Sequence, residues 1–211
     1  MKIKLISDFI DYYDHWFDNE GIYLERMSRN NLSRSEMFKL FNEQRIECPK
    51  HGQIKDLINV MSLQKKVVIY LDDYEHRGNG KKLMFLRDAR HLYPNFYASE
   101  FIESNVTSYR ELWLGNLHFV LKYSSDDIWR SNVGNVKIDI EVEHIIYSYK
   151  RKFKFPIYAI DYVINPFTDN KSYKYLAIDL NTSPMIKGTG LENIIMAKEM
   201  ADSIKDYVNK T

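Results

Sequence analysis

Two aspartates and an asparagine stand inside apolar stretches near the end of the chain. The stretch 159–163, AIDYV, contains Asp161, and the stretch 177–181, AIDLN, contains Asp179 and Asn181. In a β-strand, side chains at i and i+2 point to one face, about 7 Å apart. If the two strands pair, Asp161 joins the other two. Since burying close carboxylates is costly, a divalent cation held by hard oxygens would offset the cost. We predict a Mg²⁺ site, with Mn²⁺ as a substitute, formed by these residues.

The spacing alone also fits a simpler arrangement. On a half-exposed sheet, the same aspartates would face solvent and form ion pairs with lysine or arginine. The way the two strands pair decides between these interpretations.

Phosphate groups next to such a cation would need positive charge and amide donors. Three places could supply them: Arg130 with Asn132, Lys122 at the end of a strand, and the loop glycines Gly78 and Gly80, which let backbone amides approach a phosphate. Each has an ordinary alternative, because the basic residues could be surface charges and Gly-Asn-Gly is typical of a turn.

Strands and helices are predicted as follows, from apolar periodicity and turn residues. Strands are expected at 2–6, 66–71, 82–87, 95–102, 155–163 and 173–180, and a hairpin is expected at 109–123 with its turn at Gly115-Asn116. Helices are expected at 8–18, 53–63 and 191–208. A further helix is expected after Ser33, because Ser33 and Glu36 have the spacing of a capping box. In 8–18, His15 lies among aspartates, which would fit a metal site, although an amphipathic helix explains the pattern better. The layout predicts an α+β fold, with a small helical part at 1–65 and a core at 66–211.

Composition limits the class of protein. The chain has 211 residues, and 30 Lys+Arg against 29 Asp+Glu give a net charge of +1, which argues against a protein that mainly coats nucleic acid or lipid. The run 150–154, KRKFK, is the best local basic patch. Cys48 is the only cysteine, and there is neither a long apolar run nor a signal-peptide pattern. We therefore expect a cytoplasmic protein.

Five segments resemble one family in order and in spacing. They are SEFIES at 99–104, SYRELWLGNLHFVLKY at 108–123, DIWRSNVGN at 127–135, AIDYV at 159–163, and AIDLNTSPMIKGTGLE at 177–192. Together they resemble the ATP-grasp fold, most closely the RimK-type carboxylate–amine (glutamate) ligases, over residues 66 to 208. The resemblance implies two lobes of mostly antiparallel sheet that bind ATP and Mg²⁺ between them.

The resemblance also implies roles for individual residues. Asp161, Asp179 and Asn181 would hold Mg²⁺. Arg130 would contact the transferring phosphoryl group, with Lys122 as a second catalytic cation. The remaining positions would bind the nucleotide: Glu100 and Ile102 around the adenine, and Arg110, Gly78, Gly80, Lys82 and Asn132 elsewhere. The implied reaction activates a carboxylate as an acyl phosphate and joins it to an amine, giving an amide or peptide-type bond.

Four departures from the family pattern bear on that activity. Asp179 replaces a glutamate, Met185 replaces a glycine, and Tyr70 or Leu71 stands where the family has a nucleotide-binding lysine, so that Lys81 or Lys82 would have to compensate. The part before residue 66 is short, and the co-substrate surface is either reduced or completed by a second copy or a protein partner. Two alternatives therefore stay open: a non-catalytic nucleotide-binding protein, and a ligase that acts on nucleic acid through 150–154.

Overall fold

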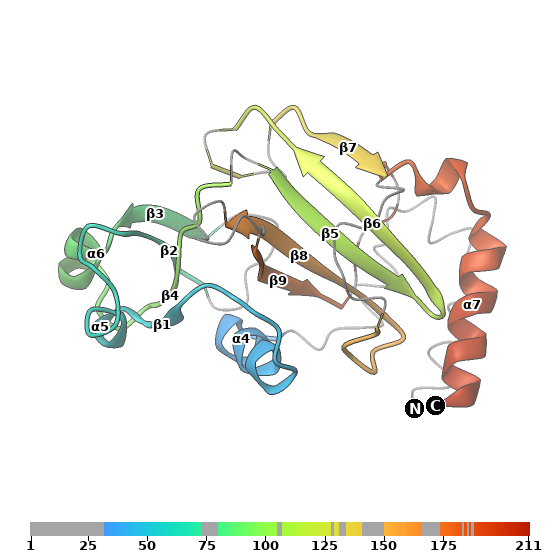
Figure 1. Cartoon of the computed structure of the whole chain (residues 1–211), viewed down its shortest axis with the longest axis horizontal. Coiled ribbons are helices and arrows are strands. Elements are labelled where there is room, and N and C mark those ends of the chain that lie inside the picture. The colour runs from blue at the N-terminus through green and yellow to red at the C-terminus, as the bar shows by residue number, and fades with distance from the viewer. Residues whose placement is uncertain are drawn as a thin grey trace.

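The chain folds into two antiparallel sheets that lie side by side, with helices around them (Figure 1). The computed structural model describes residues 32–72, 80–104, 107–127, 129–130, 134–140, 150–165, 174–182, 184, 186 and 188–211. The elements expected at 2–6 and 8–18, with His15, lie outside these residues. The α+β prediction, with two lobes of mostly antiparallel sheet, is confirmed.

The small lobe is a four-stranded sheet in the order β1-β4-β2-β3. Its strands are β1 (His51–Gln53), β2 (Lys66–Tyr70), β3 (Lys81–Phe85) and β4 (Tyr97–Glu100), and its helices are α5 (Ile54–Leu57) and α6 (Leu86–Leu92). Along β2 the side chains alternate. Val67 and Ile69 pack with the two helices, while Val68 and Tyr70 point to the other face, toward the large lobe. The predicted division at residue 65 stays a prediction.

The large lobe is a five-stranded sheet in the order β7-β6-β5-β8-β9. Its strands are β5 (Thr107–Leu114), β6 (Leu117–Ser124), β7 (Lys137–Ile140), β8 (Ile157–Asn165) and β9 (Lys174–Asn181). The hairpin predicted at Gly115-Asn116 is confirmed, because Leu114 pairs with Leu117 across a two-residue turn. On β9, Ile178 is an extra residue: Asp179 pairs with Asp161, and Ala177 with Tyr162.

Two helices cover opposite faces of the large sheet. Helix α4 (Arg34–Glu43) begins with the predicted capping box and packs Met37 and Phe41 against one face, while its Phe38 stacks on His51 and Tyr97 of the small lobe. Helix α7 (Ala197–Lys210) packs Met200, Ala201 and Ile204 against the other face. Among the described residues, no helix is long and apolar enough to cross a membrane.

Three predicted element bounds were wrong. The helix expected at 53–63 ends at Leu57, and the carbonyls of Leu63 and Lys65 beyond it accept hydrogen bonds from Arg87 and Leu86 of α6. The strand expected at 82–87 ends at Phe85, and residues 86 and 87 belong to α6. The helix expected at 191–208 begins only at Ala197, after a short 3-10 turn at Leu191–Asn193 that follows Gly190 in the left-handed region.

Candidate functional site

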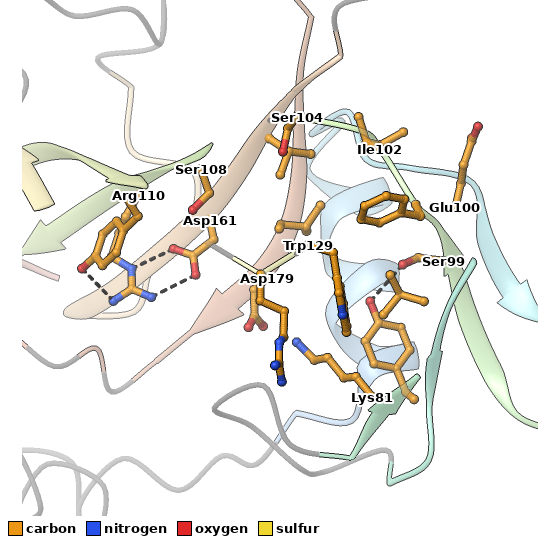
Figure 2. A pocket seen from close by; sticks show the side chains of 17 residues that line it. Lys81, Ser99, Glu100, Ile102, Ser104, Ser108, Arg110, Trp129, Asp161 and Asp179 are labelled. Carbon is orange, nitrogen blue, oxygen red and sulfur yellow. Dashed lines mark hydrogen bonds and ion pairs between the residues drawn. The ribbon is translucent and has the colours of Figure 1, made fainter. Parts of the chain in front are cut away.

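A cavity lies where the two lobes meet, and both sheets contribute to its wall (Figure 2). The small lobe contributes Val68, Tyr70, Lys81, Ser99 and Glu100; the connection contributes Phe101, Ile102 and Ser104; the large lobe contributes Ser108, Arg110, Tyr123, Asp161, Val163, Ile178 and Asp179; and the loop after β6 contributes Trp129 and Arg130. The wall therefore has an apolar, aromatic part and a strongly charged part.

The two predicted aspartates lie together in the charged part. Asp161 on β8 and Asp179 on β9 are direct cross-strand partners, and both line the cavity. Cross-strand partners have Cβ atoms only about 4.5–5.5 Å apart. Asn181 pairs with Ala159 and follows Asp179 on the same face, although it does not itself border the cavity. The three oxygen-bearing side chains thus share one face of the β8–β9 pair, with Asn181 at its margin.

Arg110 holds Asp161 through two parallel hydrogen bonds. Its Nε donates to Oδ1 at 2.7 Å and its Nη2 to Oδ2 at 2.9 Å, and its guanidinium lies 4.9 Å from the centre of the Tyr123 ring. Burial alone lowers the pKa of Arg110, but the Asp161 carboxylate outweighs burial and raises that pKa above its ordinary value. Arg110 is therefore a permanent cation at the cavity.

Arg34 holds Asp179, and sequence analysis did not identify it. It is the first residue of α4, its side chain is fully buried, and its Nη1 lies 2.5 Å from Asp179 Oδ1. Its guanidinium also lies 5.2 Å from the centre of the Tyr70 ring. No sequence signal joins residues 145 positions apart. The capping box places Arg34 on the helix but does not indicate what it contacts.

Lys81 approaches the aspartates from the small lobe. It is the cross-strand partner of Tyr70, its Nζ lies 5.8 Å from the Tyr70 ring centre, and Figure 2 shows its side chain pointing into the cavity near Asp179. No described residue forms a hydrogen bond or an ion pair with its ammonium group. Burial lowers the pKa of Lys81, and Asp179 counters this in part. The ammonium group is thus placed to bind an anion in the cavity.

Lys82, the lysine named first from the sequence, lies on the other face of β3. Its Nζ donates to the hydroxyl of Tyr93 at 2.6 Å, and it does not border the cavity. Strand alternation explains the difference, because adjacent residues on β3 point to opposite faces. The pairing of Tyr70 with Lys81 is the signal that selects Lys81.

Lys122 is likewise turned away from the cavity. It pairs with Tyr109, whereas Arg110 pairs with Leu121, so Lys122 lies on the face of β6 opposite to Arg110. Tyr123, the next residue, lines the cavity in its place. The two-residue turn at Gly115-Asn116 fixes the register between β5 and β6. Counting residues from this turn along each strand therefore predicts that Lys122 and Arg110 lie on opposite faces of the sheet.

Arg130 lines the cavity and is held by its own loop. Its Nη2 donates to Asp127 Oδ2 at 2.9 Å, while Asp127 Oδ1 accepts from the backbone amides of Trp129 and Arg130. These donors, Arg130 first, hold the pKa of Asp127 well below its usual range. Beside Arg130, Trp129 meets Phe101 edge to face, with ring centres 6.3 Å apart. The loop therefore brings a cation and an indole to the cavity together.

The other predicted nucleotide-binding residues are placed less directly. Ile102 borders the cavity, and so does Glu100, whose carboxylate pairs with Lys65 at 3.3 Å. Gly80 has a φ of +63° just before β3 and does not border the cavity. Gly78 and Asn132 lie outside the described residues.

The oxygen donors suit a cation that also takes ligands from a phosphate. Across the described segments, no group of three or more His, Cys, Asp or Glu residues could hold a metal ion. The donors here are two carboxylates and one amide. Both carboxylates already accept from arginine, yet each oxygen keeps further lone pairs. Mg²⁺ bound through one or two carboxylates, with water and phosphate oxygens around it, fits this set better than a cation caged by protein alone.

Known structures resemble this chain, although no family model and no curated protein matches it. ATP-grasp ligase PsnB complexed with its minimal precursor aligns with a TM-score of 0.60 and 13% identity, over 84% of this chain and 60% of that one. PsnB complexed with a phosphomimetic variant of the minimal precursor, Mg and ADP aligns with a TM-score of 0.58 and 12% identity, over 84% of this chain and 58% of that one. D-alanine–D-alanine ligase from Bacillus anthracis, complexed with ATP, aligns with a TM-score of 0.54 and 9% identity, over 85% of this chain and 66% of that one. The chain thus spans about three fifths to two thirds of the length of these proteins.

Proposed function

We propose, from the ATP-grasp fold of this chain and the charges in its cavity, that it is an ATP- and Mg²⁺-dependent carboxylate–amine ligase. The observation that supports this most is the cross-strand pair Asp161–Asp179, with the ammonium of Lys81 pointing into the same cavity. Two close carboxylates need cationic partners, and a polyphosphate needs cationic partners too. A cavity with both charge signs offers partners for both the cation and the phosphates of a metal–nucleotide complex. The narrower resemblance to the RimK type stays a prediction.

The solved structures support the choice of ligands. One PsnB structure is a complex with a phosphomimetic variant of the minimal precursor, Mg and ADP, and the Bacillus anthracis ligase structure is a complex with ATP. For this chain we assign the apolar part of the wall, with Phe101, Ile102 and Trp129, to the base. We assign the charged part, with Lys81 and Arg130, to the phosphates, while Asp161, Asp179 and Asn181 hold the cation.

The proposed reaction has two steps. An oxygen of the substrate carboxylate attacks the γ-phosphorus, which gives an acyl phosphate and ADP. An amine nitrogen then attacks the acyl carbon, the bond to phosphate breaks, and the nitrogen loses a proton, which leaves an amide. Mg²⁺ would neutralise charge on the phosphate oxygens. The residues of the chain contribute by positioning and by charge: Lys81 and Arg130 stabilise the transferring group, and Arg110 fixes Asp161.

A non-catalytic nucleotide-binding protein is the second candidate. One observation favours it: each aspartate already accepts a short hydrogen bond from an arginine, so the pairs Arg34–Asp179 and Arg110–Asp161 could be purely structural. The ligand would then be bound but not converted.

A ligase acting on nucleic acid is supported less. In the run 150–154, Phe153 is buried, and Arg151 donates to the carbonyls of Gly115 and Phe155 and, at 3.1 Å, of Pro156. This arginine is therefore committed to the fold. Binding of the protein to DNA or RNA that weakens as the salt concentration rises would support a ligase acting on nucleic acid, and no binding at low salt would exclude it.

Trapping of the acyl phosphate separates the ligase from the binding protein. The protein is incubated with ATP, Mg²⁺, pooled amino acids and peptides, and hydroxylamine, which replaces the unknown amine. A ligase releases ADP and gives hydroxamates, and Arg130→Ala and Asn181→Ala lower both products. Binding of Mg·ADP without ADP release from ATP would favour the second candidate. Turnover equal to wild type in both variants would show that the site is elsewhere.

A further inference from the structure

Arginines already pair with both aspartates of the cavity. Arg110 and Arg34 hold Asp161 and Asp179, and Lys81 and Arg130 add two more cations to the wall or to its edge. Arg130 has its own partner, Asp127, outside the cavity wall. Among the described residues, the pairs Arg130–Asp127 and Lys65–Glu100 each balance themselves, which leaves three cations, Arg34, Arg110 and Lys81, against the two carboxylates Asp161 and Asp179. A bare divalent cation meets a site whose net charge repels it, whereas a polyphosphate meets a site that attracts it.

We propose, on the basis of the function proposed above, that Arg34 is a positioning residue that makes divalent-cation binding depend on the nucleotide. Its guanidinium serves as the counter-ion of Asp179 while the nucleotide is absent, and it lowers the attraction of that carboxylate for a free cation. A polyphosphate supplies the negative charge that restores the attraction. The metal therefore binds with the nucleotide and not before it.

The surroundings of Arg34 fix its charge in place. Its side chain is fully buried, at the start of a helix whose capping box is complete, and the guanidinium contacts the Asp179 carboxylate and lies 5.2 Å from the centre of the Tyr70 ring. Lys81 lies against the same ring. Because the Arg34 side chain has no exposure to water, its charge is screened far less than that of a surface arginine. Helix α4, outside the strands that form the cavity wall, thereby sets the charge of the site.

Mn²⁺ titrations followed by electron paramagnetic resonance test this role. They are done with and without ADP on the wild type, on Arg34→Met, which keeps the length of the side chain without its charge, and on Arg34→Lys, which keeps the charge. We expect the wild type to bind Mn²⁺ at least about tenfold more tightly with ADP than without it. In Arg34→Met, Mn²⁺ alone should bind about tenfold more tightly than in the wild type, while ADP, measured with Mn²⁺ present, binds several-fold more weakly. Arg34→Lys should resemble the wild type.

Opposite changes in the affinities for Mn²⁺ and for ADP distinguish this role from a structural one, because damage to the site would weaken the binding of both. Unchanged or weaker binding of Mn²⁺ alone in Arg34→Met overturns the proposal. If that variant does not fold, as judged by circular dichroism, the wild type decides: equal Mn²⁺ affinity with and without ADP overturns it. A wild type that binds no Mn·ADP at all contradicts the proposed function itself, which is a different result.

Discussion

Asp161 and Asp179 stand directly opposite each other across strands β8 and β9, and a different arginine holds each of them. Like charges in this position destabilise a sheet unless they are compensated. Here the compensation comes from two distant parts of the chain: Arg110 on the neighbouring strand β5, and Arg34 on helix α4. The arrangement compensates both carboxylates and keeps them at the cavity wall, where the proposed metal–nucleotide complex would lie.

Removal of Arg110 should destabilise the protein much more than removal of a surface arginine. Arg110→Met leaves Asp161, which is 17% exposed, without its two-bond partner and opposite a second carboxylate. We expect the free energy of unfolding to fall by roughly 2–4 kcal/mol, somewhat less than for a fully buried pair. Urea denaturation measures it.

Arg87→Met is the matched control for that variant. The Arg87–Asp88 pair is about half exposed on both sides and 3.4 Å long, so we expect a loss of no more than about 0.5 kcal/mol. Equal losses in the two variants would mean that the Arg110–Asp161 pair contributes no more than a surface contact.

Nucleotide binding should weaken with rising pH earlier than an ordinary lysine would allow. Burial lowers the pKa of Lys81 from 10.5, so its ammonium loses its proton below the usual range. The affinity for Mg·ADP, measured by calorimetry from about pH 7 to about pH 9.5, should fall as the charge is lost. Lys81→Arg should keep its affinity over this range, and Lys81→Met should bind weakly throughout. A wild-type affinity that stays constant over the range would argue against Lys81 as the phosphate-binding group.

Stability should change in the opposite direction over the same pH range. The unfolded chain holds the Lys81 proton up to the ordinary pKa, and the folded protein loses it at lower pH. Between the two pKa values the unfolded state binds more protons, so the contribution of this group to the free energy of unfolding rises with pH. Comparison of the wild type with Lys81→Met isolates that contribution.

Position 115, in the turn between β5 and β6, should tolerate no side chain. Gly115 has a φ of +60°, and a Cβ built on it would lie 2.1 Å from the backbone oxygen of Ser203 in α7. Gly188 has a similar φ of +82°, but a Cβ built on it would have no atom of the described residues within 4 Å. Gly188→Ala should therefore cost about 1 kcal/mol, from the backbone alone. Gly115→Ala should cost about 3 kcal/mol or more, because α7 must also move. Similar unfolding free energies for the two variants would mean that α7 does not press on this turn.

Local patterns in the sequence predicted much of the fold. The capping box at Ser33 and Glu36, the turn at Gly115-Asn116 and the alternating strands each rest on interactions within a few residues, and the structure contains all three. The aspartates were identified for the same reason: a carboxylate inside an apolar strand stands out, and spacing of two residues fixes its face.

The rest of the site depends on relations that a single sequence does not express. Which of two adjacent lysines faces the cavity depends on strand register. The register of β2 and β3 places Lys81 toward the cavity and Lys82 on the other face, and the register of β5 and β6 places Lys122 away from the cavity. The contact between Arg34 and Asp179 joins residues 145 positions apart, and only the packing of α4 on the large sheet creates it. The extra residue Ile178 likewise follows from pairing with β8.

Calorimetric titration with Mg·ADP tests the central claim most directly, on the wild type, Asp161→Asn, Asp179→Asn and the exposed control Asp88→Asn. The wild type and the control should bind alike, and the two site variants should lose at least about tenfold in Mg²⁺-dependent affinity, about 1.4 kcal/mol, while remaining folded. Absence of binding to the folded wild type, or wild-type affinity in both site variants, would contradict a metal–nucleotide site at Asp161 and Asp179.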